Sequence, residues 1–405
     1  MRSGTDVIKS VMKDKKKELE AVVMIDKKMI AKVIKDFVTK ESVLVYGGVA
    51  LNAVLPKDLK FYRPGEYPDY DCMSTDAKKH SIKLADALHD AGFQYVEVRE
   101  AVHEGTYKVF VNFEAVADVT QVRPKFFEEM MKIGKTIRGM HTAPLYYMKH
   151  SVIKELARPD GSYYRWPKVY QRSKLLDKIV RFDKVTELSE SPPLITDKEV
   201  SRVLKSTMAF LRVHKVPVVG TFAVKKILGL TGVDYRHDWR LDPFFSFFDV
   251  LSMNALETFD LMKKHVELSD GWELVGVKRF FYQEVLPKRI RVYLKKSGSR
   301  DMISLMTIMN TQEDCYSVMN KGGYVLGNPY TVLQYLYAYW LVYYTYEASA
   351  ISDNVNTLIA TMEAYIHTKA SGDEKFTGKC FGVQKTITDV MKERWNNGEG
   401  FVYRP

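Results

Sequence analysis

The sequence predicts an α+β fold made of two similar mixed units, and three observations lead to this prediction. The first is the order helix, apolar strand, glycine turn, helix, Asp-x-Asp strand and helix along residues 5–92. The second is the return of the same order after residue 200. The third is a chain of 405 residues, 46% of them hydrophobic, which is enough for two or three domains with substantial cores. A mainly disordered protein is excluded.

The elements of the first unit are predicted from periodicity and from helix start and stop signals. Apolar residues recur every three or four positions before residue 40, and Ser74, Thr75 or Asp76 can cap a later amphipathic helix that stops at Gly92. The predicted elements are helix 5–40, strand 43–46, a helix through residue 55 that Gly47-Gly48 opens, strand 70–73, a helix up to Gly92, two strands within 106–122 and helix 145–157.

The second unit is predicted as a copy of the first. The matching pairs of segments are 45–51 with 218–224, 70–76 with 248–254, and 142–153 with 327–338. Three pairs in the same order indicate an internal duplication. The second copy has lost acidic residues: Phe247 falls opposite Asp69, Asp249 remains, and segment 302–310 contains no acid. We therefore expect the first copy to be the enzyme and the second to be inactive.

Composition limits the partners and the compartment. Lys and Arg exceed Asp and Glu by 61 − 50 = 11, which suits a polyanionic partner, although many enzymes are mildly basic without one. Cys72, Cys315 and Cys380 are odd in number and far apart, so the sequence predicts neither a disulfide framework nor a zinc site, and favours a reducing compartment. The apolar run 330–346 holds seven tyrosines and is expected to be a buried core helix, not a membrane span. We expect a cytoplasmic protein without a membrane partner.

Three aspartates form the candidate catalytic constellation. Asp69 and Asp71 are two residues apart on a predicted strand, so their side chains share one face, and Asp118 lies on a later strand. Carboxylates that converge in this way favour hard cations such as Mg²⁺, and two such ions can clamp an in-line phosphoryl displacement. Gly47-Gly48, at a strand-to-helix turn, would let backbone N–H groups approach a triphosphate.

These residues resemble a known family. The order GG, Asp-x-Asp and a distant third Asp is that of the DNA polymerase β-like nucleotidyltransferases. The segments YGGVALN, PDYDCMS and ADVTQV are similar to the poly(A) polymerase catalytic subunits of large cytoplasmic DNA viruses, of the poxvirus and mimivirus type. The resemblance is strongest over residues 40–180 and weaker over 200–345. Two features depart from the superfamily: Gly48 stands where Ser is usual, and Gly48 and Asp69 are 69 − 48 = 21 positions apart, which is longer than usual.

The resemblance implies a polymerase β-like nucleotidyltransferase domain, then a second, degenerate one, between helical extensions. The expected domains are an N-terminal helical segment 1–40, a catalytic domain 41–190, a degenerate domain 191–350 and a C-terminal helical tail 351–405, with the Ser/Pro-rich stretch 189–197 as the joint. The resemblance also implies a template-independent poly(A) polymerase that adds AMP from ATP to RNA 3′ ends with two Mg²⁺ or Mn²⁺ ions. The expected partners are ATP, the RNA 3′ end, and a homodimer mate or a viral processivity subunit.

Further residues are assigned to binding. Asp69, Asp71 and Asp118 are expected to hold both metal ions. The expected nucleotide-binding residues are Gly47, Gly48, Asn52, Lys149 and Lys174. Within the basic and aromatic stretch 162–174, the expected RNA-binding residues are Tyr164, Arg165, Lys168 and Arg172, with packing of this loop on its own domain as the equal alternative.

Two other functions stay open at this point. One is a nucleotidyltransferase that acts on a tRNA or a small-molecule acceptor. The other is a non-catalytic RNA-binding scaffold subunit made of two inactive copies.

Overall fold

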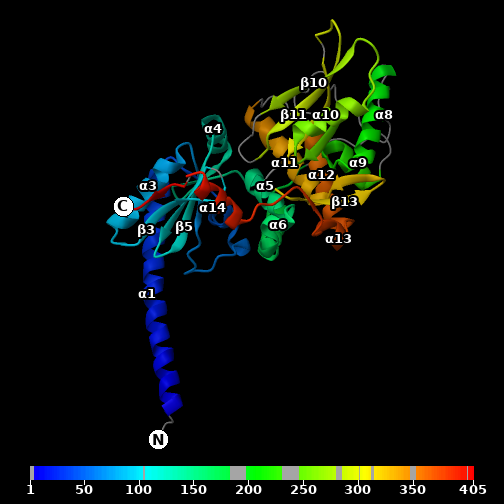
Figure 1. Ribbon diagram of the computed structural model, residues 1–405. Coiled ribbons are helices and arrows are strands. Elements are labelled where there is room, and N and C mark those ends of the chain that lie inside the picture. Colours follow the sequence, from blue (N-terminus) through cyan, green and yellow to red (C-terminus); the bar gives the residue numbers. More distant parts are fainter. Residues whose placement is uncertain are drawn as a thin grey trace. The chain divides into compact units, whose positions relative to one another are not determined.

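The computed structural model describes residues 4–103, 105–182, 198–229, 246–279, 285–300, 302–311, 314–346, 353–398 and 400–405. The chain forms two compact units. The first comprises Met1–Pro144 and Ile387–Pro405, and the second comprises Leu145–Thr386. Figure 1 shows each unit as a β-sheet with helices around it. The predicted α+β class is confirmed.

The first unit is an eight-stranded sheet with the order β16-β3-β4-β5-β2-β1-β7-β6. Its elements are α1 (Gly4–Lys40), β1 (Leu44–Tyr46), α2 (Gly47–Val54), the 3₁₀ helix η1 (Lys57–Leu59), β2 (Tyr70–Ser74), α3 (Ala77–Asp90), β3 (Val96–Glu100), β4 (Thr106–Val111), β5 (Glu114–Gln121), α4 (Pro124–Ile133), β6 (Lys135–Ile137), β7 (Met140–Thr142), α14 (Ile387–Asn396) and β16 (Val402–Tyr403). The N-terminal half of α1 projects away from this sheet (Figure 1).

The second unit has a sheet with the order β10-β11-β12-β9-β8-β14-β13-β15. Its elements are α5 (Leu145–Leu156), α6 (Pro159–Ser162), the 3₁₀ helix η2 (Tyr163–Arg165), α7 (Trp166–Ile179), α8 (Lys198–Val213), β8 (Val218–Val219), α9 (Gly220–Leu228), β9 (Phe248–Ser252), α10 (Ala255–His265), β10 (Trp272–Arg279), β11 (Arg289–Lys296), β12 (Met302–Asn310), β13 (Tyr316–Lys321), β14 (Tyr324–Gly327), α11 (Pro329–Tyr346), α12 (Asp353–Thr368), α13 (Gly372–Lys375) and β15 (Cys380–Phe381).

The two sheets have the same internal order, so the predicted duplication is confirmed. Strands β3, β4, β5, β2, β1, β7 and β6 of the first sheet correspond in turn to β10, β11, β12, β9, β8, β14 and β13 of the second. The directions agree as well, because β1–β2 and β8–β9 are antiparallel whereas β2–β5 and β9–β12 are parallel.

The copies also share the turn between the acid-bearing strand and the next helix. In the first unit, Ser74 Oγ accepts from the backbone N–H of Asp76, and the Asp76 side chain caps α3 by accepting from Lys79 N. In the second unit, Ser252 Oγ accepts from Asn254 N, and Asn254 caps α10. Asp76 accepts from one and Asn254 from two of the otherwise unpaired N–H groups at a helix start, and both helices begin three residues after their strand serine.

Helix α11 forms the centre of the second unit. Every residue from Tyr330 to Val342 is buried, which confirms the expectation of a core helix. Within the described part of the chain, no helix combines the length and the apolar character that crossing a membrane requires.

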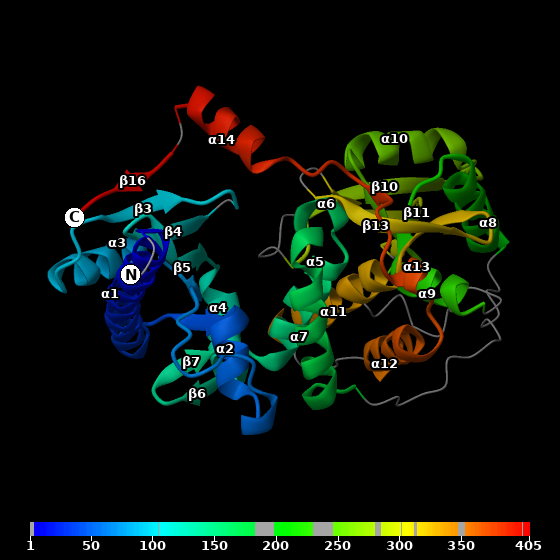
Figure 2. The ribbon, with the colours of Figure 1, turned by 90° about the horizontal axis from the view of Figure 1, so that it is seen from below.

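The two compact units divide the chain differently from the predicted domain boundaries, which remain a prediction. Helices α5 and α7 belong to the second unit, and the stretch 351–405 is shared between both units. Its last strand, β16, pairs with β3 at the edge of the first sheet (Figure 2). The predicted joint 189–197 lies outside the described residues.

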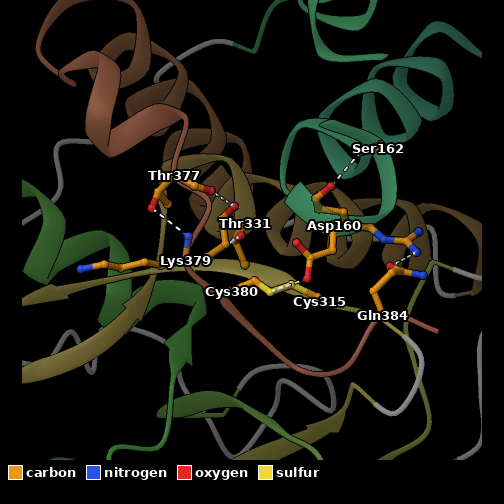
Figure 3. Close-up of a disulfide and its surroundings, with 10 residues drawn as sticks. Asp160, Ser162, Cys315, Thr331, Thr377, Lys379, Cys380 and Gln384 are labelled. Carbon is orange, nitrogen blue, oxygen red and sulfur yellow. Dashed lines mark hydrogen bonds between the residues drawn. A yellow bond between two sulfur atoms is a disulfide. The ribbon is translucent and has the colours of Figure 1, made fainter. Parts of the chain in front are cut away.

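The expectation that the cysteines form no disulfide is wrong. Cys315 and Cys380 are bonded, with their Cα atoms 5.4 Å apart, and Asp160 lies beside them (Figure 3). The reason is tertiary: β15 pairs with β13 and places Cys380 opposite Ser317, next to Cys315. A separation of 65 residues along the chain hides this proximity from the sequence. The third cysteine, Cys72, is free and buried.

We expect Cys315→Ser and Cys380→Ser each to lower the free energy of unfolding of the second unit by about 4 kcal/mol, because the disulfide closes a long loop in the unfolded chain. Chemical denaturation of the full chain measures this loss. The double variant should lose no more than either single variant, and a reductant should bring the wild type to the same value without changing the variants. Unequal single losses, or a wild type that ignores the reductant, would contradict this account.

Candidate active site

Two of the three predicted aspartates lie side by side on the first sheet. Asp71 of β2 is in register with Asp118 of the parallel strand β5 and with Tyr46 of the antiparallel strand β1. Because directly paired residues point to the same face of a sheet, both carboxylates project from one face. Asp69 precedes the first residue of β2 and is exposed, whereas Asp71 and Asp118 are half-buried. The structure therefore brings Asp71 and Asp118 together at the sheet surface, with Asp69 at the start of the same strand.

The glycine turn lies directly against this pair. Gly47 begins α2 with φ = +67°, and a Cβ atom built there would overlap the Asp71 carboxylate. Any L-residue would therefore be strained by its backbone conformation and would also push Asp71 away. Gly48, the second residue of the turn, is buried. The first backbone N–H groups of α2 therefore lie beside the Asp71 carboxylate.

Cys72 follows Asp71 on β2, and its thiol is free and buried. It is 1% exposed. Burial first, and then the negative charges of Asp71 and Asp118, raise the pKa of the Cys72 thiol well above its ordinary value. Cys72 therefore stays protonated and cannot serve as a nucleophile.

The structure adds a residue that the sequence reasoning missed. Lys108 of β4 is in register with Asp118, and its Nζ lies 2.5 Å from Asp118 Oδ2. A plain hairpin around the turn at Asn112 and Phe113 would have paired Lys108 with Ala117. A β-bulge between Val109 and Phe110 shifts the register by one residue. The only signal in the sequence was a lysine within a short strand, and it does not reveal the bulge.

The donor set suits a hard cation. Asp69, Asp71 and Asp118 offer only carboxylate oxygens, which Mg²⁺ and Mn²⁺ prefer. The ammonium group of Lys108 already places a positive charge against Asp118. Their oxygens are not gathered around one point. Among the described residues, the one trio of Asp, Glu, His or Cys ligand atoms within 4.8 Å of each other is Asp160, Cys315 and Cys380, whose sulfurs are bonded to each other.

The other predicted nucleotide-binding residues have structural partners. Asn52 Oδ1 accepts from the backbone N–H groups of Phe61 and Tyr62, at 2.9 and 3.1 Å, and so holds the loop before Asp69. Lys174 lies over the ring of Tyr170, 4.4 Å from its centroid. The nucleotide-binding role of both residues stays a prediction.

Lys149 lies in the second unit and is 1% exposed. Its Nζ is 3.2 Å from Asp177 and 2.5 Å from Glu363, and it donates to the carbonyl of Val180. A lysine that is buried and paired in this way compensates part of the negative charge of two half-buried carboxylates. Its predicted contact with a nucleotide would require these ion pairs to open.

The predicted RNA-binding stretch divides into two parts. Tyr163 and Tyr164 are exposed by 64% and 68%, so their rings are accessible. Trp166 and Tyr170 instead pack on Phe376 of the same unit, with ring centroids 5.7 and 5.3 Å apart. The packing interpretation therefore holds for Trp166 and Tyr170. RNA binding by the exposed Tyr164 stays a prediction.

The charged residues of this stretch also differ. Arg165 is paired with Glu155 at 3.3 Å. Lys168 is exposed and Arg172 is half-buried. RNA binding by these residues stays a prediction.

The corresponding position in the second sheet is buried. Gly220 repeats the turn with φ = +71°, and its missing Cβ again leaves room for a carboxylate, that of Asp249. Asp249 is 1% exposed and accepts a hydrogen bond from Tyr339 at 2.7 Å. Its partner across the parallel strands is Thr307, at the position of Asp118. Only one acid remains, as predicted.

Burial changes the ionisation of Asp249. Desolvation raises its pKa from 3.8 to about 7, although the hydrogen bond from Tyr339 and the positive charge of Arg291 act in the opposite direction. The folded state therefore holds a proton that the unfolded state releases between about pH 4 and pH 7. In that window the folded state binds more protons, so stability decreases as the pH rises.

We expect Asp249→Asn to remove this pH dependence and to make the chain more stable than the wild type at pH 8, by up to roughly 4 kcal/mol. Asn cannot ionise, and its side-chain oxygen can still accept the hydrogen bond of Tyr339. Denaturant unfolding between pH 5 and pH 8 measures the effect. Asp260→Asn, which changes an exposed carboxylate on α10, should keep the wild-type slope. A parallel slope for Asp249→Asn would refute the assignment.

Comparison with known proteins agrees with the site. The profile of the family described as "Poly(A) polymerase catalytic subunit" matches residues 32–162, which include all three aspartates. A protein of Acanthamoeba polyphaga mimivirus, described with the same words, is 31% identical over 186 residues, which are 44% of this chain and 31% of that protein. A protein of African swine fever virus with this description is 32% identical over 111 residues, 27% of this chain and 23% of its own length.

The aligned part thus spans about a third or less of the length of these relatives. The fold similarity extends further. The crystal structure of the Megavirus polyadenylate synthase superposes on 100% of this chain and 86% of its own, with a TM-score of 0.73 and 19% identity, which shows the fold alone. The predicted resemblance of this chain to the poly(A) polymerase catalytic subunits of large DNA viruses is thereby confirmed.

Proposed function

We propose that the chain is a template-independent poly(A) polymerase that adds AMP from ATP to the 3′ end of RNA. The observation that carries this proposal is the pairing of Asp71 with Asp118 across parallel strands. This pair lies beside a turn in which only glycine fits at position 47. Both features lie within residues 32–162, where the family profile matches.

Each residue has a role that follows from its place. Asp69 and Asp71 would hold the divalent cations that neutralise the triphosphate. Asp118, on the neighbouring strand, would hold with them the cation that activates the RNA 3′-hydroxyl. When bound, such ions lower the pKa of the attacking hydroxyl and stabilise the leaving pyrophosphate. The backbone N–H groups at Gly47 and Gly48, at the start of α2, would approach the phosphates.

We expect the second unit to bind RNA or to stabilise the fold, and to take no part in the reaction. Asp249 faces Thr307 instead of a second acid, and Tyr339 already occupies one of its oxygens. A cation there would have to compete with a buried hydrogen bond for a single carboxylate. We place the activity in the host cytoplasm, as for a viral enzyme, with a homodimer mate or a viral processivity subunit as the partner to be sought.

We expect Asp69→Ala, Asp71→Ala and Asp118→Ala each to reduce AMP addition by about a thousandfold or more, because each removes a ligand that acts in the transition state. The assay extends a labelled oligoribonucleotide with each of the four NTPs in turn, and circular dichroism checks the fold. Asp249→Asn is the matched control and should tail like the wild type. Tailing near the wild-type rate by one of the three variants would remove that residue from the site. A wild type that extends no RNA would favour the tRNA, small-molecule or scaffold alternatives.

We expect RNA affinity to fall steeply as salt rises, because every neutralised phosphate releases counterions. Lys168→Gln should reduce the slope of log affinity against log salt by about one. Fluorescence anisotropy with an oligoribonucleotide between 50 and 300 mM KCl is the measurement. Lys79→Gln, on the exposed side of α3, should leave the slope unchanged. Affinity that does not depend on salt would indicate a small acceptor.

A further inference from the structure

Both sheets place a basic residue at the same position, opposite Asp118 in the first sheet and opposite Thr307 in the second. This residue is Lys108 in the first sheet and Arg291 in the second. The strand register across the first site is Tyr46, Asp71, Asp118, Lys108, and across the second it is Val219, Asp249, Thr307, Arg291. The basic residue is therefore present in both copies, although the acid opposite it is present in only one.

The same irregularity of the backbone positions both basic residues. A bulge follows Lys108 between Val109 and Phe110, and a bulge follows Arg291 between Val292 and Tyr293. In each case the extra residue lies on the partner strand, two positions before the one that faces the basic residue. Without the bulge, the basic residue would pair with the residue before, and Asp118 or Thr307 would point to the opposite face of the sheet.

In the first copy the contact is direct. Lys108 Nζ lies 2.5 Å from Asp118 Oδ2, and the two side chains are 36% and 20% exposed, so solvent screens the pair only in part. A metal ion bound to the same oxygen would lie about 2.0–2.1 Å from it. Two cations cannot share one carboxylate oxygen at these distances without strong repulsion.

We propose that Lys108 is the internal counter-ion of Asp118 in the metal-free protein, and that a divalent cation binds only by displacing the Lys108 ammonium from this carboxylate. This inference rests on the proposed function, because it takes Asp118 as a metal ligand. Lys108 is a positioning residue: it compensates the clustered negative charge when no metal is bound and weakens the affinity for the ion that Asp118 holds. The second copy keeps the basic residue but has no acid to release, so it has no such exchange.

The test measures Mn²⁺ binding to the full chain without RNA or nucleotide, by isothermal titration calorimetry and by the electron paramagnetic resonance signal of free Mn²⁺. Lys108→Met should bind Mn²⁺ about three- to tenfold more tightly than the wild type, because the competing charge is gone. Its metal-free form should melt at a lower temperature, and added Mn²⁺ should raise that temperature more than in the wild type. Lys108→Arg should stay close to the wild type in both measurements.

Two controls isolate the contact. Lys79→Met removes the same charge from the exposed side of α3 and should leave Mn²⁺ affinity unchanged. In an Asp118→Asn background, Lys108→Met should no longer tighten binding, because the pair is already broken. If Lys108→Met does not fold, Lys108→Gln replaces it in every comparison.

The outcomes separate the two proposals. Equal or weaker Mn²⁺ binding by Lys108→Met or Lys108→Gln, or an equal gain in Lys79→Met, overturns the inference and leaves the proposed function standing. A wild type that binds no Mn²⁺, or a Mn²⁺ affinity that Asp71→Asn leaves unchanged, overturns the metal site itself, and the inference falls with it.

Discussion

The close approach of a carboxylate to a glycine backbone determines the architecture of both units. In each copy an apolar strand ends at a glycine with positive φ, and the aspartate of the neighbouring strand occupies the space where a Cβ atom would be. This contact requires the register Tyr46–Asp71 in the first sheet and Val219–Asp249 in the second. Because the register of an antiparallel pair decides which face every side chain takes, the rest of each sheet follows from it.

The same scaffold produces opposite electrostatic environments. In the first unit, Asp71 and Asp118 stay half-buried beside an exposed Asp69, so carboxylates remain available at the surface of the sheet. In the second unit, Tyr339 of the buried helix α11 donates to Asp249, and burial raises the pKa of that carboxyl to about 7. A site of this kind loses its chemistry without losing its fold, because the glycine turn and the strand order depend on backbone geometry and not on the number of acids.

Much of this could be predicted from local patterns. The glycine turn, the Asp-x-Asp strand and the cap at Asp76 are short signals, since each depends on a few neighbouring residues, and together they predicted the first sheet and its repeat. What could not be predicted depends on contacts distant in sequence or on a register shift. The bulge that turns Lys108 toward Asp118, the disulfide that β15 makes possible, and the return of β16 to β3 leave no periodic trace in the sequence.

The basic residue that precedes the bulge has a different environment in each copy, and burial contributes to the difference. Lys108 is 36% exposed in its side chain, and water can solvate its ammonium if a metal ion takes Asp118. Arg291 is 5% exposed, and its charge lowers the pKa of Asp249, which desolvation raises. A guanidinium held in the core cannot move into water as an exposed ammonium can. The basic position therefore supports reversible exchange in the first sheet and permanent compensation of a buried acid in the second.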